Sequence, residues 1–211
     1  MKISIIGTGN MGTTLAKYVA EAGHNLRLGS RSAQKGAQVA TDIGHDVKGG
    51  TITDALLHGD IIFLAVPYAA MTKILSITGP LAGKIVVDMS NPISPPHFEL
   101  SIGHTTSAAE EIANQIPQAY VVKAFSNVFA TVLKKSRQFG SERIHIFHAS
   151  DNENANQRVA EIIQSAGFKA VNAGPLKSAR YIEPIAALTI QVDNHLDRNV
   201  QIAAAMLERT Q

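Results

Sequence analysis

The chain has 211 residues, of which 45% are hydrophobic and 17% charged, and its formal net charge is +2 at pH 7. This length suits one domain with a sizeable core, and the composition excludes a disordered chain, while the small charge argues against a nucleic-acid partner. The sequence contains no cysteine, which excludes disulfides, thiolate metal sites and cysteine nucleophiles.

The first predicted element is an apolar run over residues 2–6, which is typical of a buried strand. It stops at glycines and is too short for a signal peptide. No later stretch approaches the roughly 18 apolar residues of a membrane span. We therefore expect a cytoplasmic protein with no membrane partner.

Short apolar runs alternate with helical patterns along the whole chain. The expected strands are 2–6, 25–29, 60–66, 84–88, 120–125, 143–148 and 168–171. The expected helices are 11–22, 33–42, 53–58, 69–77, 108–115, 152–166 and 179–208. This alternation implies right-handed crossovers, and hence a doubly wound, mainly parallel α/β sheet with helices on both faces. We expect a single domain over 1–211, with the sheet and crossover helices in 1–172 and a C-terminal helical extension in 173–211.

Local residues indicate where several of these elements begin, end or bend. Thr53 is the expected N-cap of the short third helix. Three prolines within the segment 90–96 predict an irregular loop. Ser107 and Glu110 have the spacing of a capping box, and Pro184 predicts a kink in the last helix.

The turn after the first strand has the pattern of a dinucleotide-binding fingerprint. It reads Gly7-Thr8-Gly9-Asn10-Met11-Gly12. Because it follows a strand and opens a helix, it has the context of a Rossmann-type fold. Gly7 would allow the tight turn, Gly9 would let the backbone approach a pyrophosphate, and Gly12 would allow close helix packing. The alternative is that these glycines serve only a tight turn.

The end of the second strand predicts which dinucleotide binds. An NAD enzyme usually has an acidic residue there for the ribose hydroxyl, whereas this chain reads Ser30-Arg31-Ser32. A hydroxyl plus a guanidinium would bind the 2′-phosphate of NADP(H), and Lys35 in the next helix would add a second charge. We therefore predict that Ser30, Arg31, Ser32 and Lys35 bind the cofactor. The alternative for Arg31 is an ordinary exposed arginine.

Two further segments are expected at the carboxyl edge of the sheet, where α/β proteins bind ligands. They are Val66-Pro67-Tyr68 and Ser90-Asn91-Pro92. Of these, we predict that Val66, Pro67, Tyr68, Asn91 and Pro92 bind the cofactor, with Pro67 as a stiff wall beside the nicotinamide ribose. The alternative is that the prolines merely end strands.

Together these residues resemble the coenzyme F420-dependent NADP oxidoreductases and their bacterial relatives. The resemblance also includes the segments 121–127, which contains Lys123-Ala124-Phe125, and 173–180. It implies that Ala124 binds the cofactor, and that Pro67, 124–127 and 174–176 surround a nicotinamide and a deazaflavin ring stacked for direct hydride transfer. The chain departs from the archaeal members at Ser126, where they tend to have histidine.

No arrangement of side chains suited to acid–base catalysis or metal binding is evident, which suits ring-to-ring hydride transfer. His145 and His148 are interpreted as structural. Asp193, His195 and Asp197 are expected on a solvated helix face. Lys123 either touches cofactor or substrate, or is a surface lysine at a strand edge.

These features predict an NADPH-dependent oxidoreductase with a small-molecule acceptor, namely a flavin or coenzyme F420. The alternatives are an imine or ketoacid reductase of the pyrroline-carboxylate reductase type, and a non-catalytic NADPH sensor. A homodimer is expected, because the last helix has more apolar residues than a lone surface helix needs. They are Ile185, Leu188, Val192, Leu196, Val200, Ala203 and Leu207.

Overall fold

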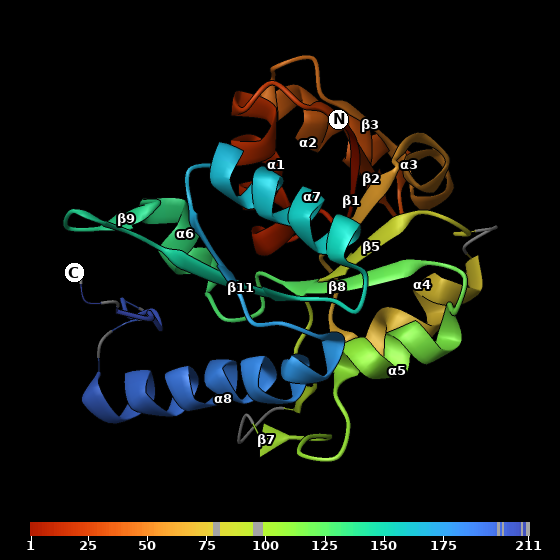
Figure 1. Ribbon diagram of the computed structural model, residues 1–211. Coiled ribbons are helices and arrows are strands. Elements are labelled where there is room, and N and C mark those ends of the chain that lie inside the picture. The colour runs from red at the N-terminus through yellow and green to blue at the C-terminus, as the bar shows by residue number, and fades with distance from the viewer. Residues whose placement is uncertain (78–80, 95–98, 198, 200, 208, 210–211) are drawn as a thin grey trace.

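The computed structural model describes residues 1–77, 81–94, 99–197, 199, 201–207 and 209. An eight-stranded sheet runs through the molecule in the order β12-β11-β8-β5-β4-β1-β2-β3 (Figure 1). Its strands are β1 Lys2–Ile6, β2 Asn25–Ser30, β3 Lys48–Thr51, β4 Ile61–Leu64, β5 Ile85–Asp88, β8 Tyr120–Ala124, β11 His145–Ala149 and β12 Lys169–Asn172. Two-stranded ribbons are β6 Ile93–Ser94 with β7 Glu99–Leu100, and β9 Gln138–Phe139 with β10 Glu142–Arg143.

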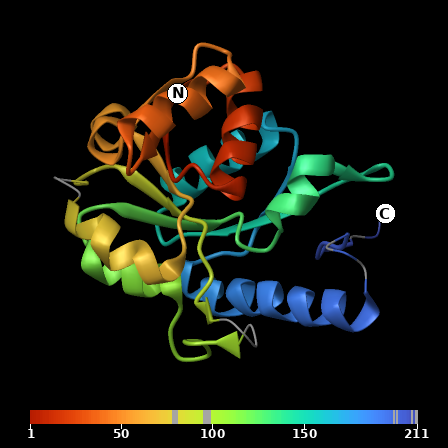
Figure 2. The same cartoon turned by 180° about the vertical axis from the view of Figure 1, so that it is seen from behind.

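Helices cover both faces of the sheet, as Figures 1 and 2 show from opposite sides. They are α1 Asn10–Glu21, α2 Ala33–Ile43, α3 Ile52–His58, α4 Met71–Ile77, α5 Ala108–Gln115, α6 Ala130–Lys135, α7 Glu153–Ser165 and α8 Ala179–Leu196. Short 3-10 turns, η1 Tyr68–Ala70 and η2 Leu176–Ser178, precede α4 and α8. The expected doubly wound α/β architecture is confirmed.

The sheet is mainly parallel because crossover helices connect most of its strands. Strands β3, β2, β1, β4, β5 and β8 all run in one direction, while β11 pairs antiparallel with β8 and parallel with β12. Alternate residues along the strands contribute side chains to two hydrophobic cores, one on each face of the sheet. One core contains Leu15 of α1 and Val159 of α7, and the other contains Ile74 of α4 and Ile112 of α5.

Two local features differ from the sequence predictions, and a third agrees with them. The N-cap of α3 is Thr51 rather than Thr53, because the Thr51 hydroxyl accepts from the Asp54 amide and the Asp54 carboxylate accepts from the Thr51 amide. The segment 90–96 is not wholly irregular, since Ile93–Ser94 pairs with β7; Pro95 and Pro96 lie outside the described residues. The Ser107 cap of α5 is confirmed.

The last helix is shorter than its apolar pattern suggested. It continues past Pro184 but ends at Leu196, where Asp197 adopts a left-handed conformation with φ of 47°. Residues 201–207 form no regular element, and Val200 lies outside the described residues. The chain instead folds back, so that the Met206 amide donates to His145 Nδ1 at 2.9 Å. Across the described part of the chain, no helix has both the length and the apolar character needed to cross a membrane.

Candidate functional site

A cavity of about 470 Å³ opens at the carboxyl ends of β1, β2 and β4. Its lining comprises Ile6, Gly7, Thr8, Gly9, Gly29, Ser30, Arg31, Ser32, Lys35, Ile52, Ala65, Val66, Pro67, Ala70 and Ile74. The charged side chains in this lining are two cations, and there is no acid among them. The cavity therefore favours an anionic ligand with a long apolar or aromatic part.

The glycine turn shows which of its glycines the fold itself requires. Gly7 has φ of +115°, and a Cβ there would lie 2.3 Å from the Ala65 carbonyl oxygen. A Cβ at Gly12 would lie 2.0 Å from the Gly7 carbonyl oxygen. A Cβ at Gly9 would meet nothing within 4 Å, so protein packing does not account for glycine at this position. Gly9 leaves an open cradle, which fits the close approach of a phosphate.

The start of α1 has free hydrogen-bonding capacity. Gly9 is the N-cap and supplies no side-chain cap, and the first turn contains no acidic residue. The amides and the positive end of the helix dipole at this terminus are therefore available to an anion. Nearby, Lys134 of α6 donates to the Asn10 side chain at 3.0 Å.

The end of β2 gathers the polar residues expected to read the ribose. The Thr8 hydroxyl donates to the Ser30 hydroxyl at 3.3 Å, which joins the glycine turn to β2. The Ser32 hydroxyl accepts from the Lys35 amide and so caps α2. Arg31 and Lys35 are both exposed and belong to the lining of the cavity.

Other predicted residues are not part of this lining. They are Asn10, Met11, Gly12, Tyr68, Asn91, Pro92 and Ala124. Ala124 is fully buried at the end of β8, and Pro92 is also buried. Tyr68 is half-buried, and its pKa is raised chiefly by desolvation. Leu176, at the start of η2, is buried against the second core.

A hydrogen bond joins the segments that follow β5 and β8. The Asn91 side-chain amide donates to the Ser126 carbonyl oxygen at 2.8 Å. Asn91 Oδ1 and the Ser126 hydroxyl are themselves buried and have no hydrogen-bond partner among the described residues. Buried polar atoms are normally paired, so these two atoms fit contact with a polar group of a ligand.

Phe125, which directly precedes Ser126, has an unusual backbone conformation. It has φ of 62°, which costs a residue with a large side chain about 1–2 kcal/mol. Edge-on contacts with Phe63 and Phe168, at centroid distances of 6.1 and 5.9 Å, hold its ring in the core. The Asn127 side chain bonds the backbone of β11 through both its polar groups, at His145 and Phe147.

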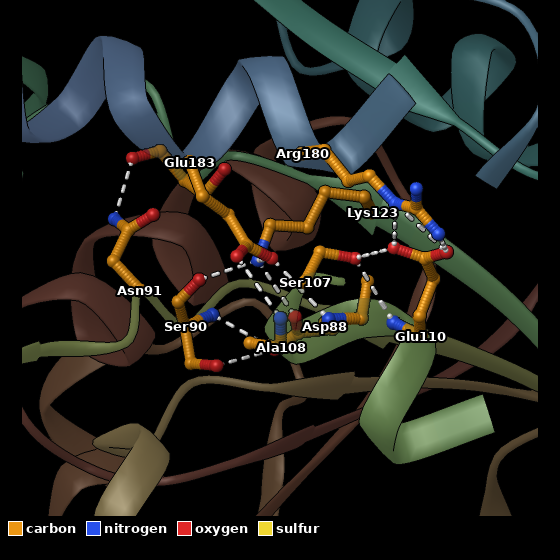
Figure 3. A network of polar contacts seen from close by, with 11 residues as sticks. Asp88, Ser90, Asn91, Ser107, Ala108, Glu110, Lys123, Arg180 and Glu183 are labelled. Atoms are coloured by element: carbon orange, nitrogen blue, oxygen red, sulfur yellow. Dashed lines mark hydrogen bonds and ion pairs between the residues drawn. The ribbon is translucent and has the colours of Figure 1, made fainter. Parts of the chain in front are cut away.

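Lys123 is the centre of a buried polar cluster that connects β5, β8 and α8 (Figure 3). It is fully buried, so the interpretation as a surface lysine at a strand edge is wrong. Its ammonium lies 2.7 Å from both the Asp88 and the Glu183 carboxylates and donates to the Ser90 carbonyl oxygen at 2.5 Å. Burial alone would lower the pKa of Lys123, but the two carboxylates outweigh it and raise that pKa above its ordinary value.

His148 and Asp193 are buried by the packing of the protein. His148 is buried, and its pKa is lowered by desolvation despite a hydrogen bond of 2.7 Å to the Asn156 side chain. Asp193 is buried rather than solvated, because α8 turns this position toward the body of the protein. Within the described ranges, no group of three or more histidine or acidic side chains could hold a metal ion.

The fold and this cavity define a class, an oxidoreductase built on a dinucleotide-binding sheet. Residues 2–92 match the family model described as NADP oxidoreductase, coenzyme F420-dependent. The F420-dependent NADP reductase of Methanothermobacter thermautotrophicus is 33% identical over 214 residues, covering 92% of this chain and 89% of that protein. The chain belongs to the F420-dependent NADP oxidoreductase family and is an NADP-dependent oxidoreductase.

Other similarities lie both within this family and beyond it. Metalloreductase STEAP3 of Rattus norvegicus is 30% identical over 187 residues, and the chain spans about a third (36%) of its length. A crystal structure from Arthrobacter sp. FB24, provisionally assigned as an F420-dependent NADP reductase, matches with a TM-score of 0.83 and 27% identity over 93% of this chain and 95% of that one. An imine reductase from Aspergillus terreus matches with a TM-score of 0.69 at 18% identity, over 94% of this chain and 63% of that one, which shows a shared fold.

Proposed function

We propose that this protein transfers a hydride from NADPH to a flavin- or deazaflavin-type acceptor that stacks on the nicotinamide. The observation that carries the proposal is the cavity itself, with an open cradle at Gly9, Arg31 and Lys35 on its rim, and no acid in its lining. NAD-specific sites usually present an acid where this chain has Ser30 and Arg31.

The order of the strands supports one orientation for the dinucleotide. Arg31 and Lys35, beside the end of β2, bind the 2′-phosphate, and the amides at the start of α1 bind the pyrophosphate. The next strands in the sheet are β4, β5 and β8. Their ends carry Pro67, Asn91 and Ser126, so the reacting end of the cofactor lies among these residues.

NADPH, when bound, supplies the hydride from its reduced nicotinamide ring. Pro67 shapes the wall beside that ring, and the unpaired polar atoms of Asn91 and Ser126 orient it through hydrogen bonds. The titratable side chains in the cavity lining are Arg31 and Lys35, both at the phosphate end. This arrangement suits transfer between two stacked rings, which needs orientation more than a proton donor.

A turnover assay with several candidate acceptors tests the proposal. The protein is mixed with NADPH and a panel containing flavins, a deazaflavin, a cyclic imine, a ketoacid and a ferric chelate, and the loss of reduced-nicotinamide absorbance is followed. We expect oxidation with the deazaflavin or a flavin. Turnover with only the imine or the ketoacid would replace the proposed acceptor, and tight NADPH binding with no turnover would favour a sensor.

We also propose that the protein acts as a homodimer through α8. The exposed residues Leu188, Val192 and Leu196 follow one another at helical spacing on this helix. Leu188 is 62% exposed and Leu196 is 48% exposed, which is a costly surface for a helix that has no partner.

A further inference from the structure

Every polar group of Ser90 is held by the buried cluster around Lys123. The Asp88 carboxylate accepts from the Ser90 amide at 2.9 Å and from the Ser90 hydroxyl at 2.7 Å. Lys123 donates to the Ser90 carbonyl oxygen at 2.5 Å. Since Ser90 directly precedes Asn91, this grip fixes the direction in which the chain leaves β5 and presents the Asn91 amide to Ser126.

Glu183 brings α8 into the same cluster. Its carboxylate lies 2.7 Å from the Lys123 ammonium and accepts from the amides of Ala108 and Ala109, at 3.0 and 3.2 Å, where α5 begins. One lysine and two carboxylates leave a formal charge of −1 in a fully buried place, which the amides at the start of α5 help to stabilise. Figure 3 shows these groups converging from β5, β8, α5 and α8.

Stability alone is a weak reason for such a cluster. Desolvation of buried ions offsets most of their mutual attraction, and apolar residues of similar volume often serve stability as well or better. A second ion pair, Arg180 with Glu110 at 2.7 Å, already joins α8 to α5 nearer the surface. What the buried cluster adds to that junction is its hold on Ser90.

We propose that Lys123 is a positioning residue: by fixing Ser90 it holds Asn91 at the reacting end of the cofactor, and Glu183 makes this hold depend on the docking of α8. The inference rests on the proposed function, because it takes the ends of β5 and β8 as the hydride-transfer region. Neither Lys123 nor Glu183 lines the cavity, so their role acts through Ser90 and Asn91.

The test compares two double variants with matched chemistry. Lys123→Met with Glu183→Gln removes one cation and one anion, so the formal charge of the cluster stays at −1. The control, Arg180→Met with Glu110→Gln, removes the outer ion pair between α8 and α5 without touching Ser90. Glu183→Gln alone is a milder test variant in case the first double variant does not fold. Urea unfolding measures the stability lost by each variant.

For the Lys123 and Glu183 variant we expect an NADPH dissociation constant within about twofold of wild type, because the cavity that holds the phosphates is untouched. Its turnover number should fall by about a hundredfold, the loss typical of a reacting group misplaced by an ångström. Glu183→Gln should lose less, and the control should keep wild-type turnover.

A second measurement does not depend on turnover. The fluorescence spectrum of bound NADPH reports the surroundings of the reduced nicotinamide, and we expect it to change in the Lys123 and Glu183 variant but not in the control. Wild-type turnover and an unchanged spectrum in that variant would overturn the inference, as would an equal loss in the control. If none of the acceptors supports NADPH oxidation by the wild-type protein, the proposed function fails. The fluorescence spectrum of bound NADPH still decides the role of Lys123.

Discussion

At the scale of single residues, we propose that Arg31 determines the choice of dinucleotide. Its guanidinium lies on the cavity rim with Lys35, and no acid is nearby in the lining to favour a ribose hydroxyl. We predict that NADPH binds at least about tenfold more tightly than NADH, a difference of about 1.4 kcal/mol. Arg31→Ala should remove most of this preference while changing the turnover number little, because the lost contact exists equally in ground and transition states.

Calorimetric titration of both dinucleotides checks this prediction. Arg143→Ala is the matched control, since Arg143 is also exposed but lies outside the cavity lining. Equal dissociation constants for NADPH and NADH in the wild-type protein would contradict the role given to Arg31.

Gly9 and Gly12 should respond to the same substitution in opposite ways. Gly9→Ala adds a methyl group to open space, so the protein should melt normally but bind NADPH at least tenfold more weakly. Gly12→Ala forces a methyl group to within 2.0 Å of the Gly7 carbonyl oxygen, so it should lower the melting temperature. Gly9→Val tests the cradle more severely. Normal NADPH binding by either Gly9 variant would place the phosphates elsewhere.

At the scale of elements, the junction between α5 and α8 should be sensitive to acid. The side-chain hydrogen bond from Arg180 is the main reason that the pKa of Glu110 lies below its ordinary value of 4.5. A carboxyl group with a lowered pKa contributes stability that is present above its unfolded pKa and is lost as the pH falls through the folded value. Glu110→Gln should therefore destabilise the protein at neutral pH and have progressively less effect below about pH 4.

Urea midpoints measured across this pH range test the junction. Glu161→Gln, at an exposed position on α7, serves as the control and should show little effect at any pH. A Glu110 variant as stable as wild type at neutral pH would show that the ion pair contributes nothing to docking.

The elements also show why part of the fold could be predicted from sequence. Strand β4 is a continuous apolar run, β1 is largely apolar, and Gly7, Gly9 and Arg31 lie in short contiguous motifs, so local pattern sufficed. Strand β3 was not predicted, because its sequence Lys-Gly-Gly-Thr has no apolar pattern. Close packing against α2 requires glycine in this strand, because a Cβ at Gly49 would lie 2.0 Å from the Gly36 carbonyl oxygen.

The remaining differences also come from tertiary contacts. The apolar spacing of α8 continues after Leu196, yet the left-handed turn at Asp197 sends the chain back toward His145. The hairpin of β9 and β10, and helix α6, are too short for a periodic signal. The cluster of Lys123, Asp88 and Glu183 unites residues far apart in the sequence, so only the folded chain reveals that this lysine is buried.

At the scale of the whole molecule, the exposed face of α8 predicts assembly. Leu188→Glu would place a charge in the middle of the proposed dimer interface, so this variant should sediment as a monomer at a micromolar concentration at which wild type sediments as a dimer. Leu57→Glu is the control, because Leu57 is 77% exposed but lies on α3. A monomeric wild-type protein would contradict the dimer, although α8 would still pack against the core.

Hydride transfer between two rings is the central claim, and following the hydride tests it most directly. NADPH deuterated at the reactive ring carbon is incubated with the protein and a deazaflavin. The hydrogen that the deazaflavin carbon receives does not exchange with water, so the mass of the reduced product, measured by mass spectrometry, shows whether deuterium was transferred. Two preparations, labelled on opposite faces of the nicotinamide, are compared. We predict that one preparation delivers its deuterium to the deazaflavin and the other delivers none. NADPH oxidation with no deuterium in the reduced deazaflavin from either preparation would contradict direct transfer between stacked rings.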